Sequence, residues 1–312
     1  MLEFTLGGPP KEASTGFSLT EPWGHPGGRA LKSSVSADLP RVDAMANPLL
    51  LGAHVKQDDP LAGAEARKAD ISQFFLGDPQ GWKKPTVGYE GGAAALRDAA
   101  DEAGVGLYVH APYVLNVATT NNRIRIPSRK LLQQIVDLAA EVGVRGVVVH
   151  GGHVLRDDDP AVGFDNWRKA VDQIDAKVPL LIENTAGGDQ AMARQLDRIG
   201  RLWDAIHEAD GGDEVGFVLD TCHAHAGGIP LATAVDDIKA ITGRIDLVHA
   251  NDSRDAFDSG ADRHVNLGDG VLDETELIDL IRAAAAPVIV ETPGGAEGQG
   301  RDIAWIRERI DN

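Results

Sequence analysis

The sequence is short of several residue types, and each shortage excludes something. It holds one cysteine, Cys222, so no disulfide can form within the chain, which fits a reducing compartment. Basic residues are scarce beside acidic ones, 30 Lys and Arg against 48 Asp and Glu, and the formal net charge is −18. This balance argues against a generally basic nucleic-acid binder, so any anionic ligand must be held by a local feature.

Long apolar runs are also missing. The longest are far shorter than the roughly 20 residues that a membrane-spanning helix needs. The first 34 residues have neither the continuous apolar core of a signal peptide nor the arginine-rich pattern of a transit peptide. We therefore expect a cytoplasmic protein with no targeting segment and no membrane partner.

Residues 1–47 contain little that could order them. They are rich in Gly, Pro, Ser and Thr and show no helical or strand period, so they predict a disordered, mobile extension. Because "MANPLLLGAHV" begins at Met45, a true start at that methionine is an alternative interpretation. Residues 48–312 are predicted to form one domain with a large core, since 43% of the chain is hydrophobic.

This remaining part alternates regularly between short apolar runs and helical patterns. Eight such units predict a closed parallel (β/α)8 TIM barrel of the α/β class. A doubly wound open sheet would give the same local alternation, and the strand count favours the barrel. Strands are expected at 49–55, 71–77, 106–113, 146–152, 179–185, 215–221, 245–252 and 287–292. Helices are expected at 60–69, 92–104, 128–143, 164–178, 191–210, 231–242, 274–286 and 301–310.

Six consecutive predicted strands carry a His, Glu or Asp near their carboxyl end, at the end of the barrel where active sites lie. One such residue is more often an ordinary hydrogen-bonded barrel residue, but three carboxylates in one half-buried mouth would repel one another unless cations compensate. Imidazole nitrogens and carboxylate oxygens suit zinc and similar ions. The predicted metal ligands at the strand ends are His110, His150, Glu183, Asp220, His249 and Glu291.

A second group of polar residues follows in two loops. His223 lies just after Asp220, where a turn is expected, and Asp262 and His264 form an i, i+2 pair, which in an extended loop places both side chains on one side. These three residues make a further nitrogen and oxygen site. The two groups together exceed what one metal can use, so we expect two or three ions.

Other features have simpler interpretations. His153 and His225 are surplus to the ligand count and are expected to support the ligands or to face solvent. Cys222 is expected to be a small buried thiol rather than a ligand or a nucleophile. The glycine-rich stretches "LGDG" (267–270) and "PGGAEGQG" (293–300) are expected to be turns and not phosphate-binding loops.

Several short motifs occur in a fixed order along the chain. They are "GAHV", "VHAPYVLNVA", "VVHGGH", "IENTAGG", "LDTCHAHAGG", "VHANDS", "DRHVNLGDG" and "VIVET". With these motifs, residues 49–310 resemble the endonuclease IV family of apurinic/apyrimidinic (AP) endonucleases, which are zinc enzymes of base-excision repair. The resemblance implies cleavage of the phosphodiester 5′ to an abasic deoxyribose, which leaves a 3′-hydroxyl and a 5′-deoxyribose phosphate, and removal of blocking groups from 3′ ends.

The resemblance also implies three zinc ions per chain, with manganese as an alternative at some sites, and no ligand of the family is missing here. It implies that Glu183 bridges two of the ions, and we expect Glu183 and Glu291 to be catalytic. The implied ligand sets are His110, His150 and Glu183 for the first ion; Glu183, Asp220, His249 and Glu291 for the second; and His223, Asp262 and His264 for the third.

The implied partner is double-stranded DNA with an abasic site or a blocked 3′ end, bound by a monomer. In the family, the loops after the second and third strands insert side chains into the DNA stack at the abasic gap. Tyr113 and Val114 occupy the place of a usual Tyr-Leu pair, so this wedge is shorter, and Gln80 stands where other members carry arginine.

Two other functions remain as alternatives. A metal-dependent sugar isomerase or epimerase of the same barrel superfamily also gathers Glu, Asp, His and Glu at its later strands, and fold analogy alone does not separate it from a nuclease. The additional residues His110, His150, His223, Asp262 and His264 favour the nuclease. A non-enzymatic binder of damaged DNA would not need a complete ligand set.

Overall fold

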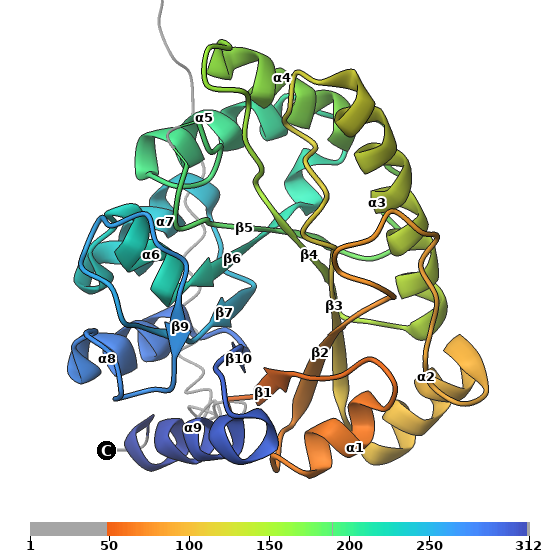
Figure 1. The fold of residues 1–312 in the computed structure, drawn as a ribbon, viewed down its shortest axis with the longest axis vertical. Coiled ribbons are helices and arrows are strands. Elements are labelled where there is room, and N and C mark those ends of the chain that lie inside the picture. The colour runs from red at the N-terminus through yellow and green to blue at the C-terminus, as the bar shows by residue number, and fades with distance from the viewer. Residues whose placement is uncertain (1–48, 189, 311–312) are drawn as a thin grey trace, which may run out of the picture. The chain divides into compact units, whose positions relative to one another are not determined.

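Eight parallel strands close into a barrel, with helices in a ring around it (Figure 1). The computed structural model describes residues 49–310 except Asp189, so the predicted extension, its boundary with the domain and the alternative start at Met45 lie outside the described residues. Within the described part, β1 pairs with both β2 and β10, which confirms the predicted barrel against the open sheet. Around the barrel the order is β1 (Leu51–His54), β10 (Val288–Val290), β7 (Leu247–His249), β6 (Gly216–Asp220), β5 (Leu180–Glu183), β4 (Val147–His150), β3 (Gly106–His110) and β2 (Ile71–Phe75).

The predicted helices are present, and capping residues explain several of their starts. Asp59, Asp159 and Asp273 each accept a backbone N–H of the first helical turn through the side chain. The helices of the outer ring are α1 (Pro60–Glu65), α2 (Gly92–Ala103), α3 (Asn122–Val142), α4 (Pro160–Val171), α5 (Leu196–His207), α7 (Leu231–Thr242), α8 (Glu274–Ala284) and α9 (Gly295–Ile310). No helix among the described residues is long and apolar enough to cross a membrane.

Helix boundaries differ most from prediction where Pro and Gly are involved. Helix α3 contains Pro127 and begins before it, because Asn121 caps the chain at that point. The expected turn at 293–300 is wrong from Gly295 onward, where the residues belong to α9. Gly298 is needed there for a close approach and not for a turn, since an added Cβ would lie 2.4 Å from the carbonyl oxygen of Pro293.

The barrel interior and the surrounding layer form two apolar clusters. The larger cluster fills the space between strands and helices and includes Trp167 and Trp203. The smaller one lies inside the barrel, where one residue of each of seven strands packs. Its members are Ile71, Tyr108, Val148, Leu181, Val218, Leu247 and Ile289.

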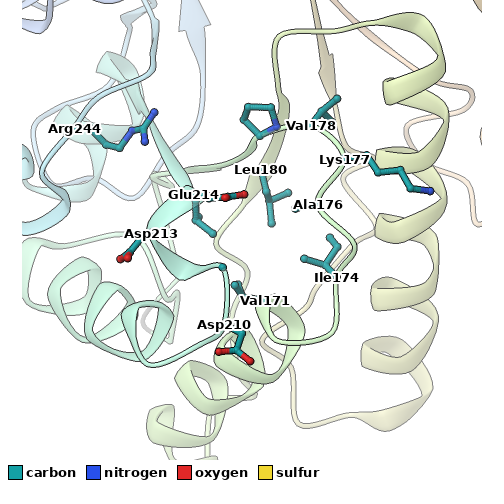
Figure 2. A pocket seen from close by; sticks show the side chains of 13 residues that line it. Val171, Ile174, Ala176, Lys177, Val178, Leu180, Asp210, Asp213, Glu214 and Arg244 are labelled. Carbon is teal, nitrogen blue, oxygen red and sulfur yellow. The ribbon is translucent and has the colours of Figure 1, made fainter.

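A cavity of about 350 Å³ opens at the amino-terminal ends of β5 and β6, the end opposite the predicted ligands (Figure 2). Its apolar wall includes Val171 and Leu180, and charged residues stand around it. Lys177, which lines the cavity, pairs at 2.7 Å with Asp137, which does not line it. The described residues of this wall include no His or Cys, and the end of the barrel that carries active sites is the other one.

Candidate metal centre

One layer of side chains at the carboxyl end of the barrel holds the candidate site. Alternate residues along a strand face the same side, so the residue two positions after an interior apolar residue faces the barrel mouth. In β6, Val218 belongs to the interior cluster and Asp220 follows it at the mouth. The layer comprises His54, Gln73, His110, His150, Glu183, Asp220, His249 and Glu291.

A first group of candidate ligands comes from three neighbouring strands. Nε2 of His110 lies 3.2 Å from Oε2 of Glu183, and Nε2 of His150 lies 3.3 Å from the same oxygen. The ligand atoms of the three residues lie within 4.8 Å of one another. His110 and Glu183 are buried, whereas the side chain of His150 is 28% exposed and faces the opening.

A second group shares Glu183 and extends around the barrel. It consists of Glu183, Asp220, His249 and Glu291, whose ligand atoms again lie within 4.8 Å of one another. Nδ1 of His249 lies 3.0 Å from Oε1 of Glu183 and 3.5 Å from Oε2 of Glu291. The two oxygens of Glu183 therefore face different groups.

The third group lies beside the barrel mouth and is built by two short elements. Helix α6 (Thr221–Gly227) holds His223, and the antiparallel pair of β8 (Asp252–Ser253) and β9 (His264–Val265) holds His264. Oδ1 of Asp262 lies 3.2 Å from Nε2 of His223 and 3.1 Å from Nε2 of His264. Asp220 reaches this group too, because its ligand atom lies within 4.8 Å of those of both histidines.

The turn predicted after the sixth strand is wrong, because residues 221–227 are helical. Asp220 accepts a hydrogen bond from the backbone N–H of His223 at 2.7 Å and so caps α6. Cys222, in the first turn, is fully buried as expected. Its Sγ also lies within 4.8 Å of ligand atoms of Asp262 and His264, which the sequence did not indicate.

Hydrogen bonds at the outer ring nitrogens determine which nitrogen each histidine directs to the mouth. Nδ1 of His110 lies 2.7 Å from the carbonyl oxygen of Ala111, and Nδ1 of His223 lies 3.0 Å from that of Asn184. A carbonyl oxygen only accepts, so both Nδ1 atoms carry a proton, and Nε2 is the ring nitrogen that each of these two histidines can offer to a metal. This arrangement, in which the outer N–H is held by an acceptor, is typical of histidines that bind metals.

The charges of the cluster compensate one another. Burial alone would raise the pKa of Glu183, but His249 and His150 outweigh it and hold the pKa well below its usual range. Burial would lower the pKa of His249, but the carboxylates of Glu291 and Glu183 raise it to about 9. Burial also opposes protonation of His264, and Asp220 and Asp262 nevertheless raise its pKa to about 11. The mouth is thus a place where buried carboxylates require positive charge.

The two surplus histidines lie outside these groups. The Asn116 side chain bonds the backbone carbonyl of His153 at 2.9 Å, and its amide nitrogen lies 3.3 Å from Nδ1 of that residue. Nε2 of His225 lies 3.0 Å from the carbonyl oxygen of Asp255, with the ring against Phe257. Neither histidine belongs to a group of candidate ligands among the described residues.

The three residues predicted to contact DNA lie in adjacent loops. Tyr113 is 51% exposed, and its ring centroid lies 5.8 Å from that of His150. Val114 is partly buried and lines, together with Tyr113 and His150, a cavity of about 270 Å³. Gln80 is exposed, and its loop is joined to the next one by the bond from the backbone N–H of Tyr113 to the carbonyl oxygen of Pro79, at 3.0 Å.

Sequence reasoning missed two members of the polar layer, His54 and Gln73. Both are interior-facing residues of the first two strands and lie opposite each other in the register. Nδ1 of His54 lies 3.2 Å from Oε1 of Glu291. The signal that could have found them is the alternation itself, since Gln73 follows the interior residue Ile71 by two positions.

Comparison with known proteins agrees with this geometry. The model of the xylose isomerase-like TIM barrel family matches residues 63–309. "Probable endonuclease 4" of Mycobacterium ulcerans (strain Agy99) is 53% identical over 264 residues, which cover 85% of this chain and 100% of that protein. The crystal structure of endonuclease IV from Thermus thermophilus matches with a TM-score of 0.72 at 25% identity, over 84% of this chain and 99% of that one.

A D-tagatose 3-epimerase-like protein also matches, with a TM-score of 0.67 over 84% of this chain and 98% of that one. At 18% identity this likeness shows the fold alone. The mycobacterial relative, in contrast, shares more than half of its residues over its whole length. The chain therefore belongs to the endonuclease IV family of xylose isomerase-like TIM barrels.

Proposed function

We propose that this endonuclease is a zinc-dependent AP endonuclease of base-excision repair. It cleaves the phosphodiester 5′ to an abasic deoxyribose in double-stranded DNA, leaving a 3′-hydroxyl and a 5′-deoxyribose phosphate, and it removes blocking groups from 3′ ends. The observation that carries the proposal is the convergence of nine His, Asp and Glu side chains on one barrel mouth, in overlapping groups whose ligand atoms lie close together.

The proposed ligand sets follow these groups. His110, His150 and Glu183 hold one ion, and Glu183 together with Asp220, His249 and Glu291 holds the second. The third is held by His223, Asp262 and His264, a set supported by the position of Oδ1 of Asp262 close to both Nε2 atoms. The donors suit zinc, with manganese as an alternative at some sites.

Unsatisfied atoms provide a test of whether metal fits. Nε2 of His223 and Nε2 of His264 are buried and have no hydrogen-bond partner, although each lies close to Asp262. A buried ring nitrogen without a partner costs folding free energy. A metal ion bound between these two nitrogens would give both a partner and would compensate the charge of the nearby carboxylates. The residues present therefore fit a metal ion at the third group.

Glu183 is suited to connect two ions because its oxygens are divided between two groups. Oε2 faces His110 and His150 of the first group, and Oε1 faces His249 of the second. Zinc held here would act as a Lewis acid on the phosphate and would activate a water molecule. Glu183 and Glu291 are the proposed catalytic carboxylates because they hold the ions that meet the reacting phosphate.

The DNA must bend to bring its phosphate into the barrel mouth, and the exposed Tyr113 and the adjacent Val114 are the proposed wedge at the abasic gap. Gln80 is the proposed additional contact, since its loop is hydrogen-bonded to the loop of Tyr113 and Val114.

All proposed ligands come from one chain, so we propose that the active form is a monomer. The presence of a single cysteine favours the cytoplasm as its compartment.

The sugar epimerase interpretation is disfavoured by the third group. A one- or two-metal isomerase has no need for His223, Asp262 and His264 beside a complete set at strands five to eight. The likeness to the epimerase-like structure concerns the fold and carries no argument about substrate.

An incision assay with metal analysis tests the proposed function. The substrate is a duplex with a single abasic analogue, assayed with and without a chelator, against an undamaged duplex as the control. We expect cleavage 5′ to the lesion only, its loss on chelation, its recovery with zinc, and about three zinc ions per chain. Full activity with one ion or fewer, or cleavage of the undamaged duplex at an equal rate, would contradict the proposal.

A further inference from the structure

Gln73 is a fully buried polar residue in the middle of β2 that none of the ligand sets includes. Its amide joins two proposed ligands of the second ion that come from different strands. The amide oxygen of Gln73 lies 3.0 Å from Nε2 of His249. Its amide nitrogen lies 2.6 Å from Oε1 of Glu291. The amide nitrogen also lies 3.0 Å from Nδ1 of His54.

The partners determine the orientation of the amide. The carboxylate of Glu291 only accepts hydrogen bonds, so the NH₂ group of Gln73 must face it. The opposite orientation would place two oxygens 2.6 Å apart with no proton between them. The carbonyl oxygen is thereby directed to His249, and because it only accepts, Nε2 of His249 must carry a proton.

This protonation leaves Nδ1 as the nitrogen of His249 that can bind a metal. Nδ1 lies 3.0 Å from Oε1 of Glu183 and 3.5 Å from Oε2 of Glu291, inside the second group. His249 thus uses the opposite nitrogen from His110 and His223, which direct Nε2 inward. To bind the metal through Nε2 instead, the His249 ring would have to rotate, and it would then lose the hydrogen bond to Gln73.

The same amide also orients the carboxylate of Glu291. Oε1 of Glu291 is occupied by Gln73 and by its 3.2 Å contact with His54. Oε2 is consequently the oxygen left toward His249. A single side chain therefore directs one donor atom from each of two residues to the same point.

We propose that Gln73 is a positioning residue that fixes the ring nitrogen presented by His249 and the oxygen presented by Glu291, and so sets the affinity of the second metal ion. This inference rests on the proposed function, in which Glu183, Asp220, His249 and Glu291 hold zinc. Removal of such an outer partner typically weakens metal binding or activity 10- to 100-fold, and we expect about that loss for one of the ions.

The test compares two variants of Gln73 with a control on the same strand. Gln73→Met keeps the approximate volume and removes both hydrogen bonds. Gln73→Glu keeps an acceptor for His249 but places a negative charge against Glu291. Ser72→Ala removes the bond from the Ser72 hydroxyl to the carbonyl oxygen of Pro60, on the outer side of β2, so it controls for loss of a buried hydrogen bond.

Three measurements on the full chain separate positioning from folding: zinc transfer to a competing chromophoric chelator, the visible spectrum of the cobalt-substituted protein, and the Tm of the metal-free form. We expect both Gln73 variants to release one zinc ion about 10 to 100 times more readily and to show an altered cobalt spectrum. Ser72→Ala should match the wild type in both, and the metal-free Tm of Gln73→Met should lie near that of Ser72→Ala.

Wild-type zinc affinity and cobalt spectrum in both Gln73 variants would overturn the inference while leaving the proposed function in place. An equal loss of zinc in Ser72→Ala would overturn it as well, because the effect would then be one of strand packing. A wild-type chain that binds no zinc would overturn both the inference and the proposed function. If Gln73→Met does not fold, the zinc affinity and the cobalt spectrum of Gln73→Glu alone decide whether the inference holds.

Discussion

The carboxylate of Asp220 and the backbone N–H of His223 are joined by a 2.7 Å hydrogen bond, so the residue that ends β6 also caps α6. Oδ1 makes this bond, and Oδ2 accepts a 2.6 Å bond from the side chain of Asn251. One carboxylate therefore positions a helix that carries one proposed ligand while it belongs to the ligand group itself.

Two substitutions should separate these roles of Asp220. Asn is a good helix cap, so Asp220→Asn should keep the bond from the backbone N–H of His223 while losing zinc and the bond from Asn251, which its NH₂ group cannot accept. Asp220→Ala should lose zinc and also about 0.5–2 kcal/mol of unfolding free energy, the usual effect of removing a cap. Chemical denaturation of the metal-free variants, with zinc analysis of the loaded ones, checks both. Equal stability of the two variants would show that the cap contributes nothing.

Glu183→Gln should abolish incision while leaving the fold, because the neutral amide keeps the shape of the side chain but not its ability to link two ions. We expect a loss of more than about 100-fold, since a ligand should matter more than the outer partners whose loss typically has a 10- to 100-fold effect. The measurement is the single-turnover incision rate at saturating zinc, with circular dichroism as the fold control. Near-normal turnover would remove the bridging role.

Zinc binding should release protons and should strengthen as pH rises toward 9. In the metal-free protein the carboxylates raise the pKa of His249 to about 9 and that of His264 to about 11, so both are protonated near neutral pH. A metal must displace these protons, and lowering the pH favours the protonated histidines over the metal. Calorimetry in buffers of different ionisation enthalpy counts the protons released. A pH-independent zinc affinity between about pH 6 and 9 would contradict this expectation.

That six polar strand-end residues meet at one rim could be predicted from the sequence, because each one follows an interior residue by two positions and parallel strands bring such residues together. The sequence did not predict the role of Gln73, because the alternation indicates that this side chain faces the barrel mouth but not that it contacts His249 and Glu291. Helix α6 was missed because a single Asp at a strand end does not reveal in advance that its side chain will cap the next residues.

Removal of residues 1–44 should leave incision unchanged. The segment offers no periodic apolar face that could dock on a barrel, and 85% of this chain already matches the whole length of the mycobacterial relative. The test is a chain that begins at Met45, compared with the full chain for Tm and for incision of abasic duplex. A large loss of either would show that the segment is part of the domain.

Tyr113→Ala should weaken binding of abasic duplex without displacing metal. The Tyr113 ring is 51% exposed beside His150, where it can stack on a base at the abasic gap. Such a contact is worth about 1–3 kcal/mol, so we expect binding to weaken by roughly 5- to 150-fold and incision to slow.

The side chain of Val114 is smaller than that of leucine and fills less of the abasic gap, so Val114→Leu should leave incision unchanged or improve it. Affinity for abasic and undamaged duplexes, measured alongside zinc content, checks both variants. Wild-type affinity in Tyr113→Ala, or a severe loss in Val114→Leu, would mean that the loop after β3 does not enter the DNA.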